Sequence, residues 1–192
     1  MVYPEPPATP ATVSYDYDDI ADGTGVDVFY LAETETTGGA AKVLTPVALF
    51  SSGDGIEEFN AAGSPTNDDY DLTAFNQPRT LIGTALLSIP VWSGNSGSVS
   101  AQLFRYDGST ETAVTSAIIQ NVTASAAAKM MLIPMPMTET LFSDGDILRL
   151  TIITTSSGGG DWKMGIDPAG RSHIELTITT TAKILIPKRL DI

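Results

Sequence analysis

The sequence predicts an all-β protein, an antiparallel two-sheet sandwich of about eight strands with a jelly-roll-like arrangement. Three observations support this prediction. Short runs of alternating apolar and polar residues recur along the chain, and turns rich in Gly, Asp and Ser separate them. No amphipathic helix of ten or more residues is evident, and threonine, which suits the solvent-facing side of a sheet, occurs 24 times in 192 residues. Strands that bury one face each pack as two layers.

The N-terminal residues 1–14 form a tract of Pro, Ala and Thr that cannot enter the centre of a sheet, because proline lacks a backbone N–H. We expect an extended arm in the polyproline II conformation. Residues 15–192 are expected to form a single β-sandwich domain. Its first strand is 26–31, which follows a Gly- and Asp-containing turn signal at 22–25.

The next elements are a strand over 42–50, interrupted by Pro46, and a long acidic loop excursion over 51–76. This excursion is rich in Ser, Gly, Asp and Asn, and residues 57–59 within it are expected to form one helical turn. A connection of this length favours a jelly roll over a simple meander. The following strand, 80–92, contains Gly83, which is typical of a β-bulge.

The remaining strands are predicted from alternation and from the turns between them. In 98–106 one face carries Val99, Ala101 and Leu103, and a hairpin-type turn at 107–109 follows it. Residues 124–131 are the best helical candidate, but β-forming residues flank them. The other predicted strands are 112–119, 128–137, 145–155 and 173–186.

Composition and charge exclude several classes of protein. The absence of Cys excludes disulfides and thiolate metal sites, and a net charge of -13 argues against a nucleic-acid-binding surface. All of this net charge falls within residues 1–75, since acids and bases balance afterwards. The N-terminus has no basic or apolar region typical of a signal peptide, and no apolar run is long enough for a transmembrane helix. We therefore expect neither nucleic acid nor membrane as a partner.

The sequence offers few residues for catalysis, and we expect no enzymatic activity. His173 is the only histidine, and the chain contains no Gly-x-Ser-x-Gly motif that would supply a nucleophile for it. Trp92 and Trp162 are the candidates for stacking on a sugar ring. No cofactor is expected except calcium, for which the loop oxygens of Asp16, Asp18 and Asp19 are candidate ligands.

Three stretches together resemble small β-sandwich structural proteins of tailed, marine-type bacteriophages. They are YDYDDIADGTG at 15–25 followed by VFY at 28–30, GDILRL at 145–150, and MGIDPAGR at 164–171. The resemblance implies a non-enzymatic virion protein, a capsid decoration (cement) protein or a head or tail fibre component. It further implies a homotrimer on the capsid surface, made in the host cytoplasm, that binds the major capsid protein or other virion subunits.

In this interpretation the N-terminal arm binds the neighbouring subunits, and Tyr3 anchors it in a pocket. The arm residues expected to make these contacts are Tyr3, Pro4, Pro6, Pro7 and Pro10.

Three other functions stay open. A single jelly-roll shell protein should face the genome with a basic surface, and the net charge of -13 speaks against it. A carbohydrate-binding or receptor-binding β-sandwich of a phage fibre predicts an exposed aromatic pair, such as Trp92 with Trp162 or Tyr106. A β-sandwich glycosidase predicts two carboxylic acids across a cleft.

Overall fold

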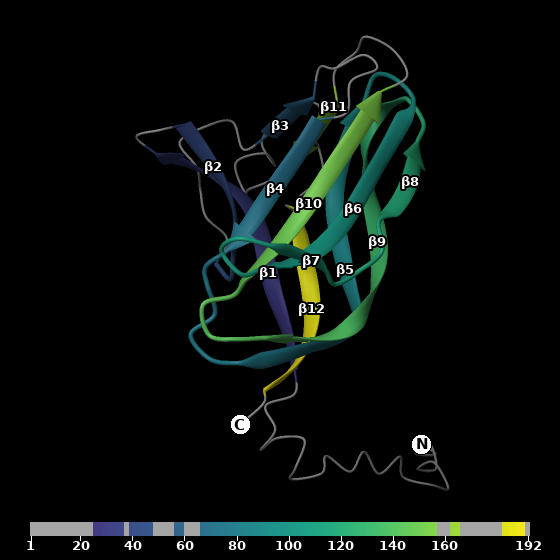
Figure 1. Cartoon of the computed structure of the whole chain (residues 1–192). Coiled ribbons are helices and arrows are strands. Elements are labelled where there is room, and N and C mark those ends of the chain that lie inside the picture. The colour runs from purple at the N-terminus through teal and green to yellow at the C-terminus, as the bar shows by residue number, and fades with distance from the viewer. Residues whose placement is uncertain are drawn as a thin grey trace, which may run out of the picture.

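The structure, a computed structural model, describes residues 25–36, 39–47, 56–59, 66–156, 162–165 and 182–190. These residues form twelve strands and no helix, so the all-β prediction is confirmed (Figure 1). The described part accordingly contains no helix long and apolar enough to cross a membrane. The strands are β1 (Gly25–Thr36), β2 (Gly39–Thr45), β3 (Ile56–Phe59), β4 (Thr66–Leu72), β5 (Arg79–Ser93), β6 (Gly97–Tyr106), β7 (Glu111–Ala113), β8 (Ile118–Val122), β9 (Ser125–Phe142), β10 (Ile147–Ser156), β11 (Trp162–Gly165) and β12 (Lys183–Leu190).

All twelve strands belong to one mixed sheet that is not closed, so the predicted two-sheet jelly roll is not what the structure shows. The hydrogen-bonded order is β3-β11-β5-β12-β1-β2-β4-β10-β6-β7, with β8 also on β6 and β9 also on β5. The pairing is antiparallel except between β2 and β4, which run parallel through Val43–Asp71 and Leu44–Leu72. This short parallel pairing joins the two parts of the sheet into one.

The sheet bends over on itself, so that β4, β10 and β6 lie in front of β1, β12, β5 and β9 (Figure 1). Both parts bury their inner faces in one hydrophobic cluster. The alternation of β10 is typical, because Leu148, Leu150 and Ile152 are fully buried while Arg149 points the other way. Buried side chains of β5, including Leu87, face this cluster from the opposite part of the sheet.

The stretch 51–76 contains two strands, β3 and β4, and the prediction of an acidic loop with a helical turn at 57–59 is therefore wrong for these residues. In β4 the inner positions are Asp68, Tyr70 and Leu72, all buried. The acidic residues hid this alternation in the sequence. They are tolerated because basic residues of neighbouring strands pair with them: the ammonium group of Lys42 binds Asp68, and Arg149 binds Asp71.

Most other predicted strands are close to the observed ones, with two corrections. The helical candidate 124–131 belongs mainly to the long strand β9, and 112–119 is divided between β7 and β8. The predicted strand 173–186 is described only from residue 182 onward. The bulge at Gly83 is confirmed: its φ is 104°, and the register of β5 with β9 shifts there.

The free edges of the sheet, β9 on one side and β7–β8 on the other, meet at few points. Thr115 and Met137 form an isolated bridge, and the Thr138 N–H donates to the Val114 carbonyl at 2.8 Å. Further along, the Gln120 side chain donates to the Leu132 carbonyl at 2.9 Å.

Candidate functional site

The outer face of β4, β10 and β6 carries a regular grid of polar side chains. The register aligns the three strands in rows, with a residue of β10 between one of β4 and one of β6. Because alternate residues of a strand share a face, each row presents three side chains on the surface. The rows are Asp71–Arg149–Phe104, Asp69–Thr151–Gln102 and Asn67–Ile153–Ser100.

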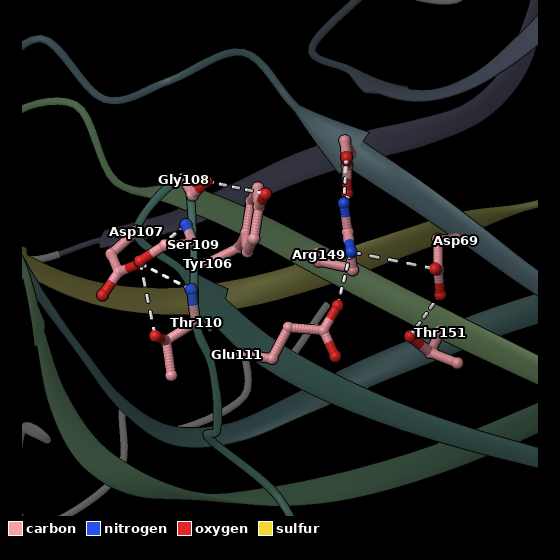
Figure 2. A network of polar contacts seen from close by, with 10 residues as sticks. Asp69, Tyr106, Asp107, Gly108, Ser109, Thr110, Glu111, Arg149 and Thr151 are labelled. Carbon is pink, nitrogen blue, oxygen red and sulfur yellow. Dashed lines mark hydrogen bonds and ion pairs between the residues drawn. The ribbon is translucent and has the colours of Figure 1, made fainter.

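Arg149 is the centre of the polar network on this face (Figure 2). Its Nε and Nη2 each donate to a different carboxylate oxygen of Asp71, both at 2.7 Å. Its Nη1 binds Glu111 of β7 and lies 3.8 Å from Asp69 Oδ2. The guanidinium carbon lies 4.6 Å from the centre of the Tyr106 ring, a cation–π arrangement.

A cavity of about 220 Å³ opens beside this network. The second and third rows of the grid line it, together with Phe104, Glu111 and Ala117. Thr151 donates a 2.6 Å hydrogen bond to Asp69, and Gln102 donates one of 2.9 Å to the Thr115 carbonyl. The first bond orients a carboxylate of the cavity, and the second fixes the segment that carries Ala117.

The charges around the cavity favour a neutral ligand over an anion. Three carboxylates, those of Asp69, Asp71 and Glu111, contact the single guanidinium of Arg149. The hydrogen bonds from Arg149 to Asp71 are the largest cause of a pKa raised above the ordinary value for arginine, and those to Glu111 add to it. Arg149 therefore stays charged, and the site keeps a net excess of negative charge that repels phosphates and nucleic acids.

The turn between β6 and β7 positions Glu111. Asp107 Oδ1 accepts hydrogen bonds from the Thr110 N–H at 2.7 Å and from the Ser109 N–H and hydroxyl at 2.9 and 2.8 Å (Figure 2). The bond from Thr110, followed by those from Ser109, lowers the pKa of Asp107 below its ordinary value. Hydrogen bonds of this kind are typical of Asp in a tight turn.

Replacing Asp107 by alanine is expected to destabilise this turn at neutral pH and to have less effect in acid. A carboxylate whose pKa is lowered in the folded state stabilises that state above the unfolded pKa and loses this effect as the pH falls through the folded value. Urea unfolding of both proteins at pH 7 and at about pH 3 measures the difference. The control is Asp144→Ala in the exposed turn before β10. An equal effect of Asp107→Ala at both pH values would contradict the assignment.

The predicted sugar-stacking tryptophans do not form a cross-strand pair. In the register of β5 with β11, Trp92 pairs with Lys163 and Trp162 pairs with Ser93. The structure describes the backbone of Trp162 but not its side chain. Trp92 is half-buried on β5, whereas Tyr106 lies on the outer face of β6, in the opposite part of the bent sheet. Sugar stacking on Trp92 and Trp162 therefore stays a prediction.

Several other predicted residues lie outside the described part of the chain. These are the arm residues Tyr3, Pro4, Pro6, Pro7 and Pro10, the candidate calcium ligands Asp16, Asp18 and Asp19, and His173. Within the described residues, no group of three or more His, Asp or Glu could hold a metal ion. The homotrimer also stays a prediction.

Sequence reasoning did not identify this cavity: Asn67 and Asp69 were predicted to lie in the acidic loop excursion, and the other lining residues were singled out for no site. Asp69, Gln102 and Thr151 come from three strands that are distant in sequence, and only the register brings them together. The one local signal was the alternation of acids in β4, which was interpreted as a loop.

Neither the models of protein families nor the curated proteins give a match to this chain. Solved structures do, at 8–11% sequence identity. A CocE/NonD family hydrolase from Staphylococcus aureus matches with a TM-score of 0.59 and 10% identity over 86% of this chain and 37% of that chain. An α-amino acid ester hydrolase matches with a TM-score of 0.55 and 11% identity, over 85% of this chain and 35% of that one. An aminopeptidase from a marine sediment archaeon, Thaumarchaeota archaeon, matches with a TM-score of 0.54 and 8% identity, over 86% and 36%.

The chain thus spans a little over a third of the length of the hydrolases that it matches. The likeness is to their β-sheet C-terminal domain and concerns the fold alone. It corrects the resemblance to structural proteins of tailed phages, which is wrong. One of the stretches that carried that resemblance, 145–150, combines a Gly–Asp turn with the start of β10, and Gly and Asp are common turn residues in any protein.

Proposed function

We propose that this chain is a non-enzymatic β-sheet binding domain that takes a neutral saccharide in the cavity on β4, β10 and β6. The observation that carries the proposal is the composition of the cavity. Asn67, Asp69, Gln102 and Glu111 place amide and carboxylate groups around one small space, together with the ring of Phe104. Sugar hydroxyls both donate and accept hydrogen bonds, and these side chains offer both kinds of partner.

The size and the charge of the cavity support the same class of ligand. At about 220 Å³ it is smaller than the pockets that bind drug-sized molecules, and it suits one sugar ring with further rings outside. The excess of carboxylates disfavours phosphorylated and acidic ligands. Phe104 at one end of the cavity supplies an apolar surface for the C–H groups of a ring.

Binding is proposed over catalysis because the carboxylates are already engaged. Arg149 contacts both Asp69 and Glu111, the two carboxylates that line the cavity, and Thr151 donates to Asp69. A glycosidase needs one of its two carboxylic acids to donate a proton to the leaving group. Here the two carboxylates both contact the guanidinium of Arg149, and neither stands across a cleft from the other as an unengaged acid.

The test is titration of the full chain with neutral mono- and oligosaccharides by isothermal calorimetry and by NMR. We expect dissociation constants on the order of millimolar for a single ring, given the few atoms in contact. Glu111→Gln should weaken binding by about tenfold, since it removes a charged acceptor inside the cavity. Asp71→Asn is the matched control: Asp71 also binds Arg149, but it does not line the cavity, so binding should persist.

Three results would contradict the proposal. The first is that no neutral saccharide binds. The second is that Glu111→Gln and Asp71→Asn lose saccharide affinity equally, which would indicate an effect through Arg149 only. Release of nitrophenol from nitrophenyl glycosides by the wild type, abolished in Glu111→Gln, would replace a binding function with an enzymatic one.

A further inference from the structure

A second cavity, separate from the saccharide site, lies where β1 and β5 begin. It has a volume of about 500 Å³ and is lined by ten residues, which come from β1, β5, β12, the end of β4 with the segment that follows it, and Pro46 after β2. Its apolar wall includes Phe29, Leu72 and Phe75, each less than 10% exposed. We call this space the β1–β5 cavity.

The charged groups of the β1–β5 cavity are unbalanced. The Asp27 carboxylate lies 3.3 Å from Arg79 Nη1 and 2.7 Å from Lys188 Nζ, so two cations share one anion. The side chains of Arg79 and Lys188 are only 17% and 20% exposed. Counted over the described residues that line it, the cavity has an excess of one positive charge in a protein whose net charge is -13, and partly buried charges need compensation.

Arg79 retains hydrogen-bonding capacity toward a ligand. Its guanidinium lies 4.5 Å from the centre of the Phe75 ring, which supports it from one side. Its Nε is buried and has no hydrogen-bond partner among the residues that the structure describes. A guanidinium carries five N–H donors, and carboxylates match its planar geometry. The cavity thus combines an apolar wall with cations suited to carboxylates.

We propose that the β1–β5 cavity binds residues 15–22 of its own chain. This segment, Tyr-Asp-Tyr-Asp-Asp-Ile-Ala-Asp, contains four carboxylates, two aromatic rings and no base. Its carboxylates complement Arg79 and Lys188, and its tyrosines complement the apolar wall. The proposal is independent of the saccharide site and goes beyond it.

The connection of the segment to the sheet supports binding within one chain. Gly25, the first residue of β1, pairs with Lys188, which itself lines the cavity. Residues 22–25, Asp-Gly-Thr-Gly, have the composition of a turn that reverses the chain. A segment attached this close has a high effective concentration at the cavity, so weak contacts suffice to bind it.

Cross-linking in the full chain tests the proposal, because the protein has no cysteine of its own. Ala21→Cys is combined with Asn76→Cys, an exposed position that lines the cavity, and the pair is treated with a short bismaleimide. The matched control pair is Ala21→Cys with Asn121→Cys, exposed on β8. We expect intramolecular cross-linking at least about fivefold faster for the first pair, by mass spectrometry.

Charge variants of the first pair show whether the cations cause binding. Arg79→Gln and Lys188→Gln should each slow cross-linking by about two- to fivefold, while Lys129→Gln on β9 should leave it unchanged. Asp27→Asn should accelerate it, because it removes the carboxylate that competes for both cations. The change in cross-linking rate is thus expected to be opposite for Asp27→Asn and for the two cation variants, whereas damage to the fold would slow the reaction in all three.

The proposal is overturned if both cysteine pairs react at the same rate, or if Asp27→Asn slows the reaction as Arg79→Gln does. Cross-linked species of twice the mass, formed in place of the intramolecular product, would show that a second copy of the chain supplies the segment. A rate that falls when calcium is added would show that Asp16, Asp18 and Asp19 bind the metal and leave the cavity.

Discussion

Replacing Leu150 by alanine is expected to destabilise the protein by about 3 kcal/mol. Leu150 is fully buried at the middle of β10, the strand that lies between β4 and β6. The substitution removes apolar contacts and leaves a cavity that strands hydrogen-bonded on both sides cannot easily fill. Urea unfolding should show a lower midpoint with an unchanged dependence of the free energy of unfolding on urea.

The matched control for this prediction lies on the other face of the same strand. Thr155→Ala should change the free energy of unfolding by less than about 0.5 kcal/mol, since its side chain points away from the core. A Leu150→Ala variant that loses less than about 1 kcal/mol would show that the two parts of the bent sheet do not pack tightly against each other.

Replacing Arg149 by methionine should cost about 2 kcal/mol at neutral pH, because hydrogen bonds to several charged groups are lost together. Methionine keeps much of the apolar contact with Tyr106. It leaves the carboxylates of Asp69, Asp71 and Glu111 facing one another without a cation. The repulsion among these carboxylates adds to the loss of the hydrogen bonds.

A double-mutant cycle separates charge repulsion from loss of packing in Arg149→Met. Adding Asp71→Asn to the variant removes one of the three carboxylates and should recover part of the lost stability, whereas Asp71→Asn alone should destabilise the wild type. Urea unfolding of the four proteins of the cycle at pH 7 provides the measurement. A double variant that recovers no stability relative to Arg149→Met would show that the network contributes only through packing.

The strands with simple alternation were the ones that the sequence predicted well. Val99, Ala101 and Leu103 mark the inner face of β6 in the sequence as they do in the structure. β4 was missed because Asp68 occupies an inner position, and only the contact with Lys42 on a neighbouring strand makes that position tolerable. The local pattern of apolar and polar residues does not predict which distant strands pair.

Because strand pairing could not be predicted, the sequence indicated other candidate sites. Those sites were chosen from tryptophans and clustered acids, whereas the cavity on β4, β10 and β6 is lined by Asn, Asp, Gln, Thr and Glu side chains that carry no local signal. Glu111 and Arg149 are 38 residues apart, and their contact depends on how β7 follows the turn at Asp107. The register of the strands therefore determines the chemistry of this surface.

Two prolines in β9 have a consequence for the shape that this polypeptide can adopt. Pro134 and Pro136 pair with Leu86 and Thr84 of β5 at positions whose amide nitrogens face the outer edge of β9. Neither has an N–H, so over that length the edge lacks two of the donors that an additional strand, from this molecule or from another, would need. A pair of imino acids thus disfavours two outcomes at once: completion of a continuous ring of strands, and stacking of molecules edge to edge into fibres.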